Sequence, residues 1–330
     1  MFDLQKFSEN IREWYQIHKR DLPWRNTTDP FNIWLSEIML QQTRVEQGLS
    51  YYLKFTERFK SVQSLAKASE DEVLSMWQGL GYYSRGRNLR KAAIQVVEEF
   101  NGKFPTNSSD LKKLKGVGDY SSAAIASFSS NEVIAVVDGN VFRVLSRVFG
   151  INTPIDSPAG KKEFNELANK LISNSHPAEH NQAIMEFGAL NCTPKKPLCD
   201  TCVLSETCEA YNANKVFDFP VKTKKIKKTS RYFHFFLDLK NDEILLEKRD
   251  DKGIWANMYQ LPLVEVEKDA TKKEAPLFEI KHILTHQNLY CSFFLSKGLK
   301  EENRIRVNLN ELHNYALPIV IDKFLKQYFN

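Results

Sequence analysis

Four of the five cysteines lie within seventeen residues, at a spacing that could bind a metal. They are Cys192, Cys199, Cys202 and Cys208, in the pattern C-x6-C-x2-C-x5-C. Four thiolates on one short segment can complete a tetrahedral zinc site or hold the corners of a [4Fe–4S] cluster. The spacing does not decide between these two, although zinc sites usually have two close cysteine pairs and this segment has one. Disulfides are not expected, because nothing in the sequence indicates secretion.

Two segments could contact phosphates. Lys195 and Lys196 lie in the long loop between the first two of these cysteines, well placed to meet a phosphate backbone. Gly116, Val117 and Gly118 form a turn between two predicted helices, and the glycines let the backbone approach a ligand closely. The amides of this turn and the start of the next helix are typical of an anion site. Alone, the turn could equally be an ordinary helical hairpin.

Two acidic residues have different expected surroundings. Glu37 lies in the middle of a predicted helix, with Ile33, Trp34 and Leu40 on the same side. This apolar surround favours the neutral carboxyl and raises its pKa, as a general acid requires. Asp138 precedes another predicted helix, where the first amides and the helix dipole favour its ionised form. Such a pair suits the cleavage of a glycosidic bond, although Asp138 could also act only as a helix cap.

The elements that position these residues are helical up to about residue 210. The first helix is expected from Leu4 to His18, a second begins at Asp29-Pro30, and Ser69 starts a capping box. Further helical stretches are 87–100, 108–114, 119–128, 139–149, 158–173 and 177–190. In this part of the chain only 133–137 has the pattern of a strand.

After Pro220 the pattern changes to alternating β-branched and aromatic residues, with a closing helix after Pro318. The strand-like runs are 232–239, 243–249, 258–264, 281–286, 289–296 and 304–309. Cys291 lies in one of them and is expected in the core. The predicted fold class is therefore multidomain, with an all-α domain followed by an α+β domain. The expected bounds are 1–214 for the helical domain with its cysteine loop at 192–208, 215–231 for a basic linker, and 232–330 for the α+β domain.

Composition sets limits on the function. The 330 residues carry 46 Lys+Arg and 41 Asp+Glu, so the net charge of +5 permits a nucleic-acid partner without requiring one. Residues 222–231 hold six basic groups and no acid, typical of a solvated linker or of a phosphate contact. No apolar run approaches the roughly 20 residues that cross a bilayer, and the N-terminus does not have the pattern of a signal peptide. We therefore expect an intracellular protein without a membrane partner.

Together these features resemble the helix–hairpin–helix DNA glycosylases with an iron–sulfur loop, the endonuclease III group, and within it the MutY-type adenine DNA glycosylases. The segments that carry the resemblance are DLPWR (21–25), WLSEIMLQQTRVE (34–46), WQGLGYYSRGRNL (77–89), LKGVGDYSSAAI (114–125), VVDGNVFRVLSR (136–147) and NQAIMEFGALNC (181–192). The resemblance covers residues 1–211 closely and continues loosely into the C-terminal half, where the family has a MutT-like (Nudix-like) domain. It implies a [4Fe–4S] cluster rather than zinc.

The resemblance implies a hydrolase of base excision repair that removes adenine mispaired with 8-oxoguanine or guanine in duplex DNA. Glu37 would protonate the base, Asp138 would stabilise or trap the sugar cation, and Asn140 would help to hold the site. Bifunctional members, which also cut the strand, have a Schiff-base lysine at the position of Tyr120. Tyrosine cannot form an imine, so a monofunctional enzyme is expected.

Other residues match positions that contact the extruded base or the duplex. Gln42 and Tyr82 match residues that enter the base stack, although Tyr82 could also be a core residue. The residues that match the adenine pocket are Trp24, Arg25 and Gln182. A glutamine amide can pair with the N6/N7 edge of adenine, so its match to the pocket is chemically reasonable.

The C-terminal half resembles a MutT-type hydrolase core at 245–265, without the glutamate-rich helix that binds metal, so nucleotide hydrolysis is not expected. In the family this domain checks the base opposite adenine with a Phe-Ser-His loop. The matching residues are Leu284, Thr285 and His286, with the hydroxyl and the histidine kept and leucine in place of phenylalanine.

Nucleotide hydrolysis is the weakest alternative function. Two others remain open. One is a bifunctional glycosylase and lyase like endonuclease III, which Tyr120 and the long C-terminal half oppose. The other is a catalytically silent DNA-binding protein with the cluster as a scaffold, which Glu37 and Asp138 oppose. The expected partner is duplex DNA with A:8-oxoguanine or A:G mispairs, bound by a monomer in the cytoplasm at the nucleoid.

Overall fold

The computed structural model describes residues 4–223, 227–268 and 274–329. The chain divides into two compact units. The first comprises Met1–Gln42, Ser61–Gln63 and Ala92–Lys224, and the second comprises Thr43–Lys60, Ser64–Lys91 and Lys225–Asn330. The second unit thus includes helical segments of the N-terminal half, a grouping that the sequence did not predict. The domain bounds expected from the sequence stay a prediction.

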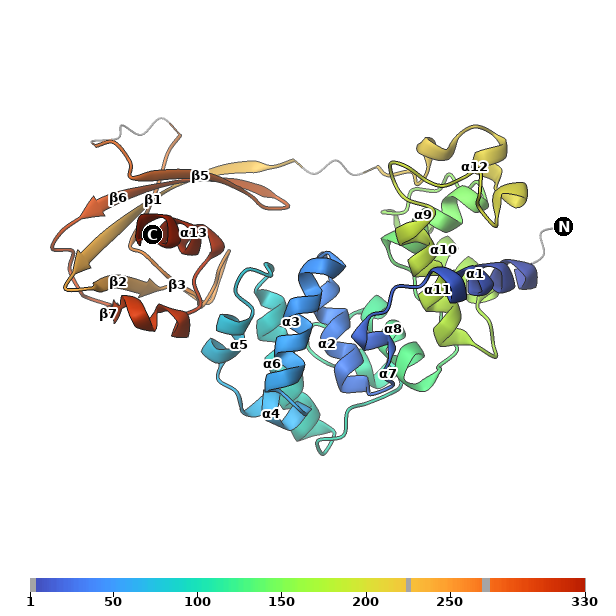
Figure 1. The fold of residues 1–330 in the computed structure, drawn as a ribbon, viewed down its shortest axis with the longest axis horizontal. Coiled ribbons are helices and arrows are strands. Elements are labelled where there is room, and N and C mark those ends of the chain that lie inside the picture. Colours follow the sequence, from blue (N-terminus) through green and yellow to red (C-terminus); the bar gives the residue numbers. More distant parts are fainter. Residues whose placement is uncertain (1–3, 224–226, 269–273, 330) are drawn as a thin grey trace. The chain divides into compact units, whose positions relative to one another are not determined.

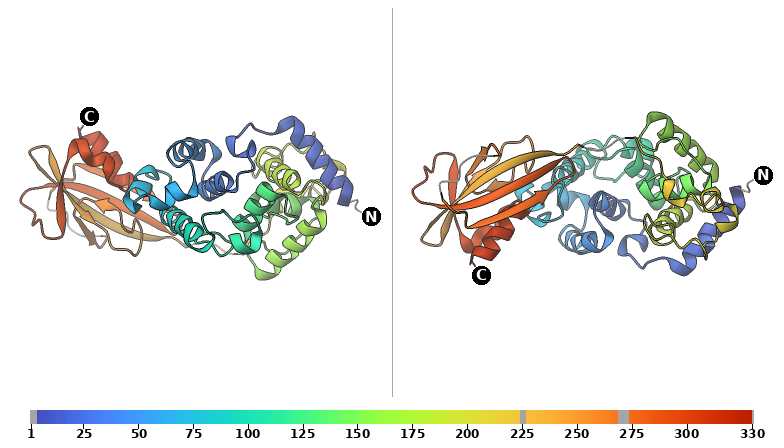
Figure 2. Two further views of the ribbon diagram at one scale, coloured as in Figure 1. Left: turned by 90° about the horizontal axis from the view of Figure 1, so that it is seen from below. Right: turned by 90° about the horizontal axis from the view of Figure 1, so that it is seen from above.

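The first unit is helical (Figures 1 and 2). Its elements are α1 (Leu4–His18), η1 (Pro23–Arg25), α2 (Pro30–Leu40), the start of α4 (Val62–Lys67), the end of α6 (Ser84–Glu99), α7 (Ser108–Leu111), α8 (Asp119–Ser130), α9 (Gly139–Val148), α10 (Pro158–Leu171), α11 (Pro177–Leu190), η2 (Ser205–Thr207), α12 (Glu209–Asn212) and η3 (Val216–Asp218). Helices α1, α9 and α11 pack around an apolar core that includes Ile11, Val144 and Phe187. Burial of each such side chain stabilises the fold by about 1.5–3 kcal/mol.

Side-chain caps fix where the helices begin. Asp29 accepts a hydrogen bond from the Phe31 amide at 2.9 Å, directly before Pro30 at the start of α2. Ser69 accepts one from the Glu72 amide at 3.0 Å, at the start of α5 (Glu70–Met76). Both predicted helix starts are confirmed. Each cap stabilises its helix by about 1 kcal/mol.

The strand predicted at 133–137 is wrong, because this segment pairs with no strand among the residues that the structure describes. Its amides instead donate to asparagine side chains. The Ala135 amide donates to Asn169 Oδ1 at 3.1 Å, and the Val136 amide donates to Asn181 Oδ1 at 3.0 Å. Because these side chains satisfy the backbone donors, the apolar run is stable as an extended connection between helices.

The second unit combines helices α3 (Val45–Arg58) and α5 and parts of α4 and α6 with a seven-stranded mixed sheet (Figure 1). Its strands are β1 (Thr229–Lys240), β2 (Glu243–Lys248), β3 (Tyr259–Gln260), β4 (Leu263–Val266), β5 (Phe278–Ile283), β6 (Gln287–Ser296) and β7 (Arg304–Asn308), followed by η4 (Leu309–Asn314) and α13 (Ile319–Phe329). The order is β3-β2-β1-β6-β5, with β4 on β1 and β7 on β2. Strands β1 and β6 are parallel, and the other pairs are antiparallel. Four of the predicted strand runs and the closing helix are confirmed. The run 258–264 is divided into β3 and β4, and the run 281–286 leaves the sheet after Ile283, where the loop to β6 begins.

Aromatic side chains form the core of this sheet. Phe235 on β1 stacks on Phe293 on β6 with ring centroids 5.0 Å apart, and Phe324 of α13 stacks on Phe293 at 4.2 Å. Cys291 on β6 is buried, as expected for a core residue. None of the described helices has the length and the apolar character needed to cross a membrane.

Part of the predicted basic linker contacts the first unit. The Ile155 amide donates to the Val221 carbonyl at 3.0 Å, and the Thr223 amide donates to Asp156 Oδ1 at 3.1 Å. Residues 224–226 of the predicted linker lie outside the described residues.

Candidate active site

Glu37 is a buried acid on the inner side of α2. Ile33 and Trp34, one turn before it, are fully buried as well. Burial raises the pKa of Glu37 to about 7; a hydrogen bond with Tyr120 lowers this pKa, Asp138 raises it and Arg25 lowers it. The predicted rise is confirmed. Near neutral pH a large fraction of Glu37 is therefore protonated and can donate a proton.

Tyr120 forms that hydrogen bond with the Glu37 carboxyl. It is the second residue of α8, which follows the glycine turn directly. Gly116 has a φ of 82°, in the left-handed region that glycine adopts without strain, so the turn sets the direction in which α8 begins. Burial, with Glu37 and Asp138 adding to it, raises the pKa of Tyr120 well above its usual value, so the phenol keeps its proton. The sequence predicted only that this position lacks an amine; it did not predict the contact.

Asp138 is the N-cap of α9, as predicted. Its Oδ1 accepts from the amides of Asn140 and Val141, both at 2.8 Å, and its Oδ2 accepts from Asn140 Nδ2 at 2.7 Å. Burial raises the pKa of Asp138, while these hydrogen bonds and Arg143 oppose the rise. The sequence predicted the stabilising amides, but it could not show the burial. Asp138 and Glu37 therefore differ in surroundings, with three hydrogen bonds stabilising the ionised form of Asp138.

Asn140 and Arg143 connect Asp138 to the cysteine segment. Arg143 donates to Asn140 Oδ1 at 2.9 Å, to the Gly188 carbonyl at 2.7 Å and to the Cys192 carbonyl at 2.8 Å. At Gly188 an added Cβ would lie 2.6 Å from Asn140 Cβ, so only glycine lets α11 pack this closely against the start of α9. Neither Arg143 nor Gly188 was predicted from the sequence, and the i+3 spacing of Asn140 and Arg143 was the only available signal.

Arg25 and Gln182, two residues that match the adenine pocket, belong to a second network. Arg25 forms two hydrogen bonds with the buried Glu186 carboxylate, at 2.9 and 2.7 Å. Burial would raise the pKa of Glu186, but bonds from Arg20 and Arg25 lower it to about 2. Gln182 lies one turn before Glu186 on α11 and accepts a hydrogen bond from Tyr15.

The third residue of that match is Trp24, which is buried in η1 next to Arg25. The acidic partner Glu186 and the tyrosine Tyr15 were missed by the sequence analysis. The i+4 spacing of Gln182 and Glu186 on α11 was the only local signal, because the contacts that Tyr15 and Arg25 make with these residues depend on how the helices pack.

Gln42 and Tyr82 both have backbones in the left-handed region, with φ of 56° and 47°. Few non-glycine residues adopt this region, and those that do concentrate at functional turns. Gln42 follows α2 in the first unit, whereas Tyr82 belongs to the second unit and is 44% exposed. Tyr82 is therefore not a core residue. The Arg85 guanidinium, 5.6 Å from the centre of the Tyr82 ring, supports its orientation.

The loop between β5 and β6 contains Leu284, Thr285 and His286. These residues line one cavity of the second unit together with Tyr82 and Trp255. The hydroxyls of Tyr82 and Thr285 are hydrogen-bonded to each other. The structure thus brings together two groups that the sequence analysis had singled out separately.

The two predicted phosphate-contacting segments are open to solvent. Gly116 and Gly118 are exposed while Val117 between them is buried, so the turn is anchored by its middle residue. Lys195 and Lys196 are exposed on the loop before Cys199.

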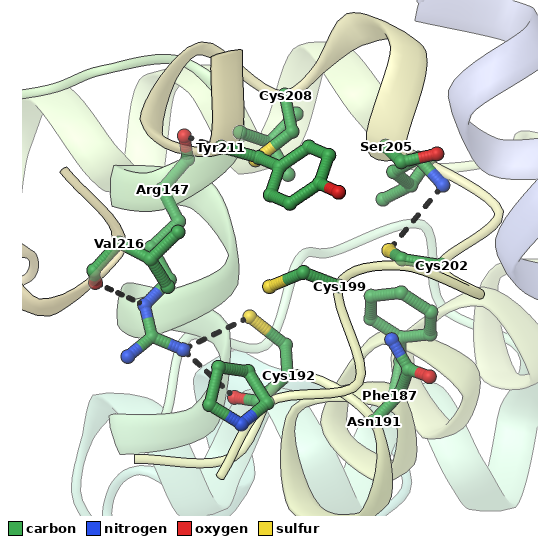
Figure 3. Close-up of a pocket in the computed structure, with 13 residues that line it drawn as sticks. Arg147, Phe187, Asn191, Cys192, Cys199, Cys202, Ser205, Cys208, Tyr211 and Val216 are labelled. Atoms are coloured by element: carbon green, nitrogen blue, oxygen red, sulfur yellow. Dashed lines mark hydrogen bonds between the residues drawn. The ribbon is translucent and has the colours of Figure 1, made fainter. Parts of the chain in front are cut away.

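The four cysteines surround one cavity (Figure 3). Hydrogen-bond donors reach their sulfurs. The Arg147 guanidinium donates to Cys192 Sγ at 3.4 Å, and the Leu204 amide donates to Cys202 Sγ at 3.4 Å. Donors of this kind are typical of iron–sulfur sites. Burial raises the pKa of the Cys202 thiol to about 11, so its thiolate requires a positively charged partner.

The residues of this cavity fit an iron–sulfur cluster. All four cysteines line it, and the Arg147 guanidinium and the Leu204 amide donate to two of the sulfurs. Four thiolates with hydrogen-bond donors to sulfur are the ligand set of a [4Fe–4S] cluster.

Three segments match known protein families. Residues 35–173 match the HhH-GPD superfamily of base excision DNA repair proteins, 192–208 match the iron–sulfur binding domain of endonuclease III, and 234–327 match the NUDIX domain. The match of residues 192–208 agrees with the four cysteines that line one cavity, and it indicates a [4Fe–4S] cluster.

The curated relatives differ in how much of this chain they cover. An adenine DNA glycosylase of Buchnera aphidicola subsp. Baizongia pistaciae is 36% identical, covering 97% of this chain and 95% of its own length. An adenine DNA glycosylase of Homo sapiens is 41% identical over 63% of this chain and 40% of its own length.

Among solved structures, a thermostable thymine-DNA glycosylase matches with a TM-score of 0.59 and 30% identity, covering 63% of this chain and 96% of that one. A non-covalent endonuclease III–DNA complex matches with a TM-score of 0.56 and 19% identity, covering 65% of this chain and 99% of that one. It shares the helical fold.

Proposed function

Since this chain belongs to the adenine DNA glycosylase family of base excision repair, we propose that it hydrolyses the N-glycosidic bond of adenine opposite 8-oxoguanine or guanine in duplex DNA, without cutting the strand. The observation that carries this proposal is a pair of carboxyls in different surroundings: the buried Glu37, with its pKa raised to about 7, and the partly buried Asp138, with three hydrogen bonds to its oxygens. Glu37 can supply a proton while Asp138 keeps a negative charge.

The proposed reaction divides the work between these two residues. Glu37 donates its proton to a ring nitrogen of adenine, so that the electron pair of the C1′–N9 bond leaves with a neutral base. The sugar then carries positive charge, which the Asp138 carboxylate stabilises or traps. Water adds at C1′ and loses a proton, which leaves an abasic site. Asn140 holds Asp138, and Tyr120 holds Glu37.

The absence of a lyase step follows from Tyr120 in this proposal. Strand cleavage by a glycosylase requires an amine that attacks C1′ and forms an imine. Tyr120 is a phenol whose raised pKa keeps it protonated, and its hydrogen bond to Glu37 gives it a different task. This supports hydrolysis over the bifunctional alternative.

Recognition of the opposite base is proposed for the second unit. The cavity lined by Tyr82 and by Leu284–His286 offers an exposed aromatic ring and a hydroxyl pair. The proposed duplex contacts are Gln42, Tyr82, Gly116, Val117, Gly118, Lys195 and Lys196. Because several of these contacts are with phosphates, binding should weaken steeply with salt.

The four cysteines would hold the [4Fe–4S] cluster, and the cluster, when bound, would supply positively charged iron that keeps their thiolates ionised. We also propose a monomer, a cytoplasmic location at the nucleoid, and the domain bounds predicted from the sequence.

The test uses duplexes whose labelled strand contains one adenine opposite 8-oxoguanine, guanine or thymine. Each duplex is incubated with excess protein, and half of the sample is treated with alkali before both halves are run on a denaturing gel. Cleavage of the adenine strand only after alkali is expected for the first two duplexes. Cleavage without alkali would instead support the lyase. Absence of cleavage in both halves, with binding retained, would support the silent DNA-binding protein.

A further inference from the structure

The side-chain amide of Gln182 is held by a buried hydroxyl on another helix. The Tyr15 hydroxyl, on α1, donates to Gln182 Oε1, on α11, at 2.7 Å. Tyr15 is 4% exposed, and burial raises the pKa of its phenol, which therefore keeps the proton that it donates. Gln182 itself is only partly buried, so the rest of its amide can reach a ligand.

This pair is connected to the candidate acid through Arg25. The Arg25 guanidinium lies over the Tyr15 ring, 5.6 Å from its centre, and also lowers the pKa of Glu37. Arg25 is held by Glu186, which lies one turn after Gln182 on the same face of α11. The fixed amide, the guanidinium and Glu37 therefore belong to one neighbourhood of the first unit.

The hydrogen bond determines which way the amide points. An amide that flips by half a turn exchanges its acceptor oxygen for its donor NH2 group and so reverses the pattern that a ligand meets. A flip of Gln182 would leave the buried proton of Tyr15 without its acceptor, which costs the free energy of an unmade buried hydrogen bond. Tyr15 thereby favours one orientation.

We propose that Tyr15 is a positioning residue that sets the base specificity of the pocket through Gln182. The amide oxygen has two lone pairs, so it can accept from Tyr15 and from the 6-amino group of adenine, while its NH2 group donates to a ring nitrogen. Hypoxanthine has a carbonyl oxygen in place of the amino group, so it would meet the fixed amide oxygen with a second acceptor. This inference rests on the proposed function, because it assumes that adenine enters beside Gln182.

The test compares single-turnover release of adenine and of hypoxanthine from otherwise identical duplexes. The variant is Tyr15→Phe, which keeps the ring under Arg25 and removes only the hydroxyl. The matched control is Ser8→Ala, because the Ser8 hydroxyl also joins α1 to α11, through His180 Nδ1 at 2.7 Å, without contacting Gln182. Thermal unfolding of both variants shows that they fold.

We expect the ratio of the adenine rate to the hypoxanthine rate to fall about tenfold in Tyr15→Phe, the value of one hydrogen bond, and to keep its wild-type value in Ser8→Ala. An unchanged ratio in Tyr15→Phe, or an equal fall in both variants, would overturn the inference. In a Gln182→Ala background, Tyr15→Phe should not change the ratio further, and a second fall there would also overturn it. A wild-type protein that releases no adenine would instead contradict the proposed function, so the two failures are distinguishable.

Discussion

The phenol of Tyr120 and the carboxyl of Glu37 are hydrogen-bonded to each other inside the first unit. This contact joins the first turn of α8, directly after the glycine turn, to the middle of α2. The glycine turn, a proposed contact of DNA phosphates, is thereby connected through Tyr120 to Glu37, the proposed acid. In the proposed mechanism, Tyr120 stands where a lyase would have its amine, and it holds the acid instead.

Replacement of Tyr120 by phenylalanine should move the pH dependence of excision. The hydrogen bond from Tyr120 lowers the pKa of Glu37, so its loss should raise this pKa above the wild-type value of about 7. Because the protonated carboxyl is the acid, the fall in single-turnover rate with increasing pH should occur at higher pH in Tyr120→Phe. The measurement is a rate profile from about pH 5 to about pH 9, spanning the pKa. A fall at the same or a lower pH than in the wild type would contradict the contact.

Replacement of Glu37 by glutamine should stabilise the fold in neutral and alkaline solution. The pKa of Glu37 is raised from 4.5 to about 7 on folding, so the folded state favours the protonated carboxyl. The contribution of Glu37 to the free energy of unfolding therefore decreases as the pH rises from about 4.5 to about 7, and it is constant above about pH 7. Glu37→Gln should therefore increase that free energy by up to about 3 kcal/mol at pH 8, and by far less at pH 5. Denaturant unfolding at both pH values measures this, and equal effects at the two pH values would show that Glu37 is not titrating as proposed.

The residues that sequence alone located are those whose neighbours lie close in the chain. The Asp138 cap, the start of α2 and the apolar surround of Glu37 depend on contacts within a few residues, and they were predicted. The Tyr120–Glu37 contact depends on how two helices pack, which local patterns do not encode. The strand predicted at 133–137 failed for the same reason, since Asn169 and Asn181 reach it from distant helices.

Replacement of Arg143 by lysine should affect both the catalytic pair and the cluster. Arg143 bonds Asn140, Gly188 and Cys192 at once, and a lysine ammonium cannot span these acceptors in the same geometry. We expect the excision rate to fall at least tenfold and the iron and sulfide content per chain to decrease. Arg12→Lys is the control, because Arg12 makes a partly exposed pair with Glu179 away from Asn140. Wild-type iron content and rate in Arg143→Lys would contradict this connection.

Replacement of Thr285 by alanine should weaken discrimination between 8-oxoguanine and guanine. Its hydroxyl bonds that of Tyr82 in the cavity of the second unit, and one such bond changes a rate ratio by up to about tenfold. The measured quantity is the ratio of excision rates for adenine opposite the two bases. Thr285→Ser keeps the hydroxyl and should keep the ratio. Equal ratios in all three proteins would show that this loop does not recognise the lesion.

The C-terminal sheet was well predicted, because alternation along a strand reports which face is buried. The pairing of β1 with β6 in parallel was not, since alternation carries no information about which strands are neighbours. The cavity that joins Tyr82 to Thr285 could not be predicted either, as its two sides come from segments far apart in the chain.

The most direct test of this account is single-turnover excision of adenine opposite 8-oxoguanine by Glu37→Gln, with mispair affinity measured on the same preparation. Glutamine keeps the shape of the side chain and cannot donate a carboxyl proton. We predict that excision is lost, by at least the 10²- to 10⁴-fold typical of a general acid, while mispair affinity stays within a few-fold of the wild type. Retained turnover in Glu37→Gln, with the abasic product confirmed by alkali cleavage, would contradict the assignment of Glu37 as the acid.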